Sequence, residues 1–243
     1  GLVGSEMCIR DRFLMITSVP SRYLGVWKRT LLEQQGSQDT SSLVLWMQTD
    51  REHADIRIPA SRPDFSNCNN LTDCSADQLR WLATQQGFTG VTEVNSSICQ
   101  WHRELDYQPK TNLRDIGEMA FDGEDTLLET GVDVPYFEVW KKLAYSHLNV
   151  NAYQVSGEDR HGRETPSRLL IAGNYFAFIR PRNVILPEAS SLQTILDKHY
   201  QSMHTLLDWL DFEISFGEIV DHITGLIQYS TLPFREGSEL RLL

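Results

Sequence analysis

Two short segments place charged side chains where they could bind or transform a small molecule. Asp55 and Arg57 stand two positions apart, as do His102 and Glu104. Alternate residues of a β-strand lie on the same face, so each pair shares one face of its strand. Trp101 lies on the face opposite His102. A guanidinium can hold an anion, and a histidine or carboxylate beside it can move a proton.

Three interpretations of these residues are open. In the first, the strands form a barrel whose cavity binds a small, largely apolar ligand, and Arg57 fixes its polar head. In the second, an enzyme works in the same cavity, with Arg57 as anion clamp and His102 or Glu104 as acid or base. In the third, the protein is a non-enzymatic interaction module: both barrels are solid, and the acidic surface, or the edge and helix of the second unit, binds another protein. The candidate ligand-binding residues are Trp27, Arg57, Trp101, His102 and Glu104.

Familiar catalytic motifs do not decide between these interpretations. The chain has no Gly-x-Ser-x-Gly, no phosphate-binding loop, no Rossmann glycine pattern and no His-Glu-x-x-His. Cys68 and Cys74 lack the second pair that a structural zinc site needs. His204 and Asp208 are one helical turn apart, a spacing also common among surface pairs. We therefore assign no catalytic residue, no metal and no cofactor.

A Trp-led segment appears twice and organises the predicted elements. Residues 23–29 (YLGVWKR) are followed by a rougher copy at 136–142 (YFEVWKK), and each copy follows a proline-containing loop. Each is interpreted as the first strand of a unit. Further strands are predicted by apolar runs and alternation at 42–49, 54–58, 88–94, 98–106, 113–121, 126–132, 137–148, 150–156, 168–171, 175–180, 213–220 and 225–232.

Two helices are predicted between the strands. Ser75 and Gln78 form a capping box, and the helix is expected to run to about residue 86 and to stop at Gly87. A second box at 190–193 opens a longer helix that is expected to reach residue 210. The order of strands, Pro-containing turn, helix and strand pair thus occurs twice, which predicts an internal duplication. The second copy has only 239–243 left for its last hairpin and is expected to end early.

Composition limits the partners. The chain has 243 residues, 41% of them hydrophobic, and a formal net charge of −11. Without clustered Lys and Arg, a nucleic-acid or anionic-membrane partner is not expected. There is no run of about 20 apolar residues, so no membrane span is expected. The partners that remain open are a small apolar molecule and another protein.

The N-terminal segment is expected to lie outside the folded protein. Residues 4–12 resemble translated sequencing adapter, and Met15 would be the natural start. The segment that follows Met15 is too short and too weakly apolar to be a secretion signal, which favours a cytoplasmic protein. The predicted organisation is a leader at 1–14, a first β-barrel domain at 15–134 and a second, expected to be cut short, at 135–243.

The Gly25-x-Trp27 segment, at the start of a strand-rich unit, resembles the signature of the calycin barrels, which include the lipocalins. Two such units in tandem, each with a central helix, resemble the Hri family from residue 23 to the C-terminus. In the second copy Glu138 replaces the glycine. The resemblance implies a mainly β (α+β) fold of two tandem calycin/lipocalin-like antiparallel barrels with one helix each. It also implies interaction with a casein-kinase-I-type kinase.

Overall fold

The computed structural model describes residues 18–199 and 202–242. The adapter-like segment and the expected start at Met15 lie outside these residues. The described chain is mainly β, as predicted, with two antiparallel sheets and three α-helices. None of the described helices has the length and apolar character needed to cross a bilayer.

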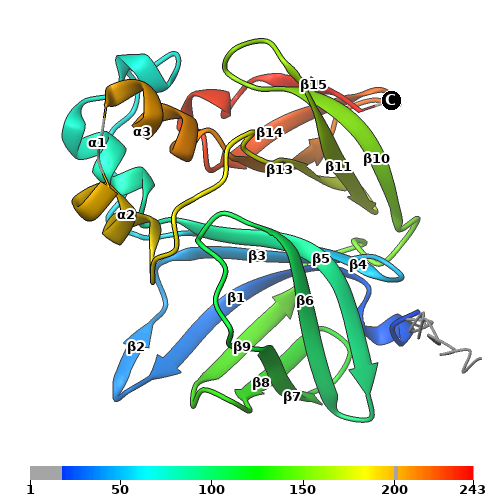
Figure 1. Cartoon of the computed structure of the whole chain (residues 1–243). Coiled ribbons are helices and arrows are strands. Elements are labelled where there is room, and N and C mark those ends of the chain that lie inside the picture. The colour runs from blue at the N-terminus through cyan, green and yellow to red at the C-terminus, as the bar shows by residue number, and fades with distance from the viewer. Residues whose placement is uncertain (1–17, 200–201, 243) are drawn as a thin grey trace, which may run out of the picture.

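The first sheet closes into an eight-stranded antiparallel barrel, which fills the lower half of Figure 1. Strand β1 pairs with β3 on one side and with β9 on the other, so the barrel has no open edge along these strands. A short strand, β2 (Ser37–Asp39), extends one end of β1. The barrel strands are β1 (Gly25–Gln34), β3 (Leu43–Gln48), β4 (Glu52–Ile58), β5 (Gln86–Asn95), β6 (Ile98–Asp106), β7 (Asp115–Phe121), β8 (Thr126–Gly131) and β9 (Phe137–Lys142).

Strand β9 differs from the expectation that residue 137 opens the second unit. It completes the first barrel, where Arg29 of β1 lies opposite Trp140 of β9. Trp27 and Trp140 therefore belong to one aromatic core instead of leading two separate barrels. The change of sheet falls between Lys142 and Asn151, later than the predicted boundary at residue 135.

The second sheet is an open, curled half-barrel of six antiparallel strands. Its hairpins at 164–180 and 213–230 agree with the predicted strand pairs. Within the described residues, its first and last strands each pair on one side only. The strands are β10 (Asn151–Glu158), β11 (Glu164–Ala172), β12 (Tyr175–Arg180), β13 (Glu213–Ile219), β14 (Thr224–Ser230) and β15 (Glu239–Arg241).

Helix α1 (Ala76–Leu82) confirms the predicted capping box, with Ser75 accepting from the Gln78 backbone and Gln78 bonding back to Ser75. The helix ends before the predicted position, and Gly87 lies in β5. A Cβ atom at Gly87 would be 2.6 Å from both the Asp55 carbonyl oxygen and Ile214 Cδ1. Close approach of the two sheets, and not helix termination, explains this glycine.

The predicted long helix is two helices, α2 (Leu192–His199) and α3 (Met203–Leu210). Ser202 begins the second, because its side chain accepts a hydrogen bond from the Thr205 backbone at 3.2 Å. The apolar stripe continues across the break, since Ile195 and Leu206 both join one core. That continuity is why spacing alone predicted a single helix.

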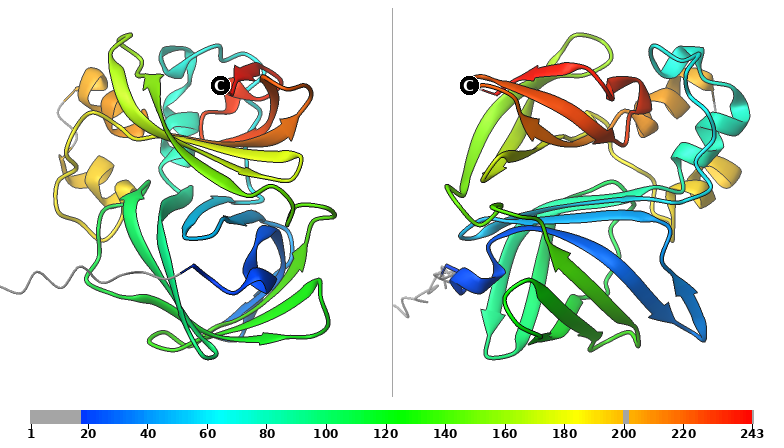
Figure 2. Two further views of the ribbon diagram at one scale, coloured as in Figure 1. Left: turned by 90° about the vertical axis from the view of Figure 1, so that its right-hand side faces the viewer. Right: turned by 180° about the vertical axis from the view of Figure 1, so that it is seen from behind.

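The two sheets stack with the helices beside them (Figures 1 and 2). The second sheet contacts the barrel at β3 and β4. The apolar face of β4, formed by Ala54, Ile56 and Ile58, points out of the barrel into the core shared by both sheets and the helices. The opposite face, with Asp55 and Arg57, lines the barrel interior. Alternation predicted the two faces correctly but did not say which one is inside.

Candidate ligand-binding site

One end of the barrel is filled by aromatic side chains. Trp27 donates its indole N–H to the Tyr23 carbonyl at 2.7 Å and stacks on Trp46 with ring centres 6.2 Å apart. The Lys142 ammonium lies 4.6 Å from the centre of the Trp27 ring. Between this aromatic cluster and the polar end there is a void of about 10 Å³, room for at most one water. This part of the barrel is solid.

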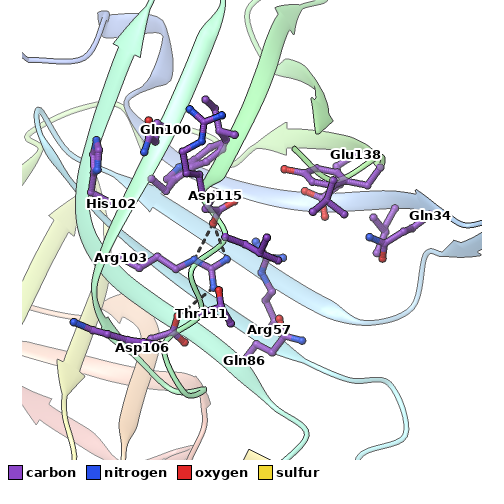
Figure 3. A pocket seen from close by; sticks show the side chains of 18 residues that line it. Gln34, Arg57, Gln86, Gln100, His102, Arg103, Asp106, Thr111, Asp115 and Glu138 are labelled. Carbon is purple, nitrogen blue, oxygen red and sulfur yellow. Dashed lines mark hydrogen bonds and ion pairs between the residues drawn. The ribbon is translucent and has the colours of Figure 1, made fainter. Parts of the chain in front are cut away.

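The other end holds a cavity of about 560 Å³. It opens between the ends of the barrel strands and the loop that joins β6 to β7. Figure 3 shows its chiefly polar lining. The polar residues that line it include Gln34, Arg57, Gln86, Gln100, Arg103, Asp106, Thr111, Asp115, Tyr136 and Glu138.

Arg57 presents its guanidinium to this cavity from β4. Nε donates to Asp55 Oδ1 at 2.8 Å and Nη2 to Asp55 Oδ2 at 3.3 Å. The bonds found within the described chain use Nε and Nη2, so Nη1 is available to a ligand, and 26% of the side chain is exposed. Burial opposes the charge and is the largest single influence, but the carboxylates of Asp55, Glu138 and Asp115 together outweigh it and raise the pKa of Arg57 well above its usual value. Arg57 is a permanent cation here.

Arg103 is another cation of the cavity, whose lining also includes Lys110 and Arg114. Its Nη2 donates to Asp115 Oδ2 at 2.6 Å and its Nη1 to Asp106 Oδ2 at 3.2 Å (Figure 3). Its guanidinium carbon lies 3.6 Å from the centre of the Phe88 ring, and that of Arg57 lies 5.4 Å from the same ring. Phe88 thus packs against both cations. Arg103 was not selected from the sequence, although alternation places it on the inward face with Trp101.

A buried carboxyl group lies next to the cavity. Glu129 of β8 is bonded by the Tyr136 hydroxyl at 2.6 Å and by the Trp140 indole N–H at 3.0 Å. Burial, reinforced by the nearby Glu138 carboxylate, raises the pKa of Glu129 well above its usual value. A protonated Glu129 still satisfies both partners, because the Tyr136 hydroxyl can accept as well as donate. Neither Glu129 nor Tyr136 was a sequence candidate.

The structure separates the five predicted site residues into three groups. Arg57, Trp101 and His102 are among the residues that line the cavity. Trp27 lies in the filled aromatic end. Glu104 lies outside the cavity and bonds Arg168 of the second sheet. The His102 ring does not contact Arg57 but has its Nε2 3.0 Å from Glu93 Oε2.

The second hypothesis required His102 or Glu104 to converge on Arg57. Their side chains are 38% and 46% exposed, and Figure 3 shows His102 pointing away from Arg57. Because Trp101 faces inward, alternation places His102 and Glu104 on the opposite face of β6. Within the described residues, His102 is bonded to Glu93 and Glu104 to Arg168, and neither is bonded to Arg57.

A closed antiparallel barrel with a polar cavity at one end is a fold compatible with a ligand-binding, lipocalin-like protein. No model of a known protein family matches the sequence, and no curated protein matches it. Among solved structures, the chain is similar to the crystal structure of an uncharacterized protein from Saccharomyces cerevisiae. The two share 11% identity with a TM-score of 0.47, over 90% of this chain and 84% of the other.

Proposed function

We propose that the first barrel binds a small molecule in the cavity at its polar end. The observation that carries this proposal is the guanidinium of Arg57, which is held by Asp55 through Nε and Nη2 and lines a cavity of about 560 Å³. That volume lies within the usual range for small-molecule sites, roughly 300–1,000 Å³. The filled aromatic end supports a ligand held near the cavity entrance.

The lining favours a ligand more polar than the largely apolar one expected from the sequence. Arg57 can bond an acceptor group, such as a carboxylate or carbonyl oxygen. The apolar contact surface of the cavity is offered by Leu32, Trp101, Leu113, Ile116 and Val134. We therefore expect an acceptor group at Arg57 and a compact apolar part beside it.

Native mass spectrometry of the protein purified from cells tests this proposal. We expect a mass excess over the denatured protein that disappears in Arg57→Gln. Arg80→Gln is the matched control, because Arg80 is an exposed arginine whose Nη1 donates to Asp197 at 3.1 Å. Far-UV circular dichroism verifies that both variants fold. An excess that survives Arg57→Gln unchanged would place the ligand elsewhere and contradict the proposal.

A second candidate function is protein binding through the half-barrel. The observation that favours it is the pair of outer strands, β10 and β15, each hydrogen-bonded on one side only within the described residues. Such an edge can accept a strand from a partner. The Hri resemblance suggests a casein-kinase-I-type kinase as the first partner to test. Stoichiometric capture of the purified kinase would support this function, and no retention at micromolar concentrations would argue against it.

Membership of the Hri family and internal duplication are proposals of the same kind. They are supported by the order of elements, because β3, β4, α1, β5 and β6 correspond to β11, β12, the α2–α3 pair, β13 and β14. The Trp-led segments do not support duplication, since both lie in one barrel.

A further inference from the structure

Away from the barrel cavity, three side chains suited to metal binding meet on the surface of the second unit. His161 lies in the loop between β10 and β11, and His204 and Asp208 lie one turn apart on α3. One ligand atom of each residue lies within 4.8 Å of those of the other two. His161 Nε2 is 2.8 Å from Asp208 Oδ1, and His204 Nε2 is 3.4 Å from Asp208 Oδ2.

The loop that carries His161 is held in place by buried carboxylates. Asp159 Oδ1 accepts the backbone N–H groups of His161 and Arg163, both at 2.9 Å. Asp211 Oδ2 accepts the backbone N–H of Arg160 at 2.8 Å. Asp211 follows directly on α3, so the loop and the helix are fixed to one another. The ligands on the two elements are thereby positioned before any ion arrives.

We propose that His161, His204 and Asp208 bind one divalent transition-metal ion, with zinc as the best match. Two imidazoles and one carboxylate are a ligand set that zinc uses, and a fourth position would stay open to water. With metal–ligand bonds of about 2.0–2.1 Å, tetrahedral ligand atoms stand about 3.4 Å apart. His204 Nε2 and Asp208 Oδ2 stand at that spacing, 3.4 Å apart, whereas His161 Nε2 lies closer, at 2.8 Å from the other carboxylate oxygen. His204 is 70% exposed, so its ring can turn to complete the site.

Arg160 competes with a metal ion for these ligands in the arrangement that the structure shows. Its Nε donates to Asp208 Oδ1 at 2.6 Å, and its Nη2 lies 3.1 Å from His204 Nδ1. The guanidinium neutralises the carboxylate and engages one imidazole, so an ion must displace it or draw the ligands away from it. Arg160 is therefore a competitor for the site, and its removal should strengthen metal binding.

Cobalt(II) titration of the full chain tests the site, because tetrahedral cobalt absorbs visible light and zinc then displaces it measurably. We expect saturation at one equivalent. His161→Asn and Asp208→Asn should each weaken binding at least about tenfold, since even changes around metal ligands cost 10–100-fold. Arg160→Gln should tighten it. His222→Asn is the control, because His222 is an exposed histidine outside the cluster, and it should bind as the unaltered protein does.

Three results would overturn the proposal. The first is no saturable binding by the folded protein. The second is binding that is equal in the unaltered protein, His161→Asn and Asp208→Asn. The third is a thiolate-to-cobalt absorption band, which would place the ion on the cysteines. Circular dichroism of each variant separates loss of the site from loss of the fold.

Discussion

Replacing Glu129 by Gln should make the protein more stable at neutral pH. Glu129 is only 3% exposed and is bonded by Tyr136 and Trp140. Gln keeps its size, accepts from the indole N–H and donates to the tyrosine oxygen. The substitution therefore removes the ionisation of this buried group while leaving its partners satisfied.

The magnitude follows from proton linkage. Because the folded-state pKa of Glu129 is raised, its stabilising contribution is complete below the unfolded-state pKa of about 4.5 and is lost as pH rises through the folded-state value. Between these limits the folded protein holds a proton that the unfolded chain has released. The free energy of unfolding should then fall by about 1.4 kcal/mol per pH unit. Glu129→Gln lacks this decline.

Urea unfolding at several pH values, followed by both tryptophan fluorescence and circular dichroism, measures the difference. The stability advantage of Glu129→Gln should grow steadily with pH above about 4.5 and then level off. Glu124→Gln serves as control, because Glu124 lies exposed in the turn between β7 and β8. A difference between Glu129→Gln and the unaltered protein that stays constant with pH would refute the argument.

Two further predictions concern packing and acid stability. Gly87→Ala should lower the free energy of unfolding by about 1–3 kcal/mol, because its Cβ would meet the Asp55 carbonyl and Ile214 at 2.6 Å; unchanged urea unfolding would show that the sheets can separate there without cost. His53 is fully buried and its ring bonds Thr92. Burial lowers the pKa of His53 well below 6.5, so stability should fall by about 1.4 kcal/mol per pH unit on acidification below about 6.5. In His53→Gln that part of the acid slope should vanish, and an identical slope in the variant would contradict the assignment.

Local signals in the sequence predicted local structure well. The Ser75–Gln78 box began a helix, and the alternation at Asp55 and Arg57 separated two faces of β4 correctly. Alternation in β6 also separated Trp101 from His102. Each of these depends on residues within one turn or one strand.

What the sequence did not predict depends on contacts between distant residues. Closure of the barrel by β9 requires that β1 pair with β9, with Arg29 opposite Trp140. No local sequence pattern indicates a pairing strand so far along the chain. The cavity was missed in part for the same reason. Arg103, Asp115 and Glu129 come from three successive strands that pair side by side, and the register between those strands brings them together. The break before α3 was missed because the apolar stripe continues through it.

The outward apolar face of β4 makes the barrel dependent on its neighbour. The second sheet and the helices cover Ala54, Ile56 and Ile58. Without them, the barrel would expose this apolar face to water. Arg57 shares its strand with these residues, standing between Ile56 and Ile58. Strand β4 therefore forms one wall of the cavity and also the contact between the barrel and the second sheet. Packing of the second sheet against β4 helps to keep the Arg57 guanidinium in place.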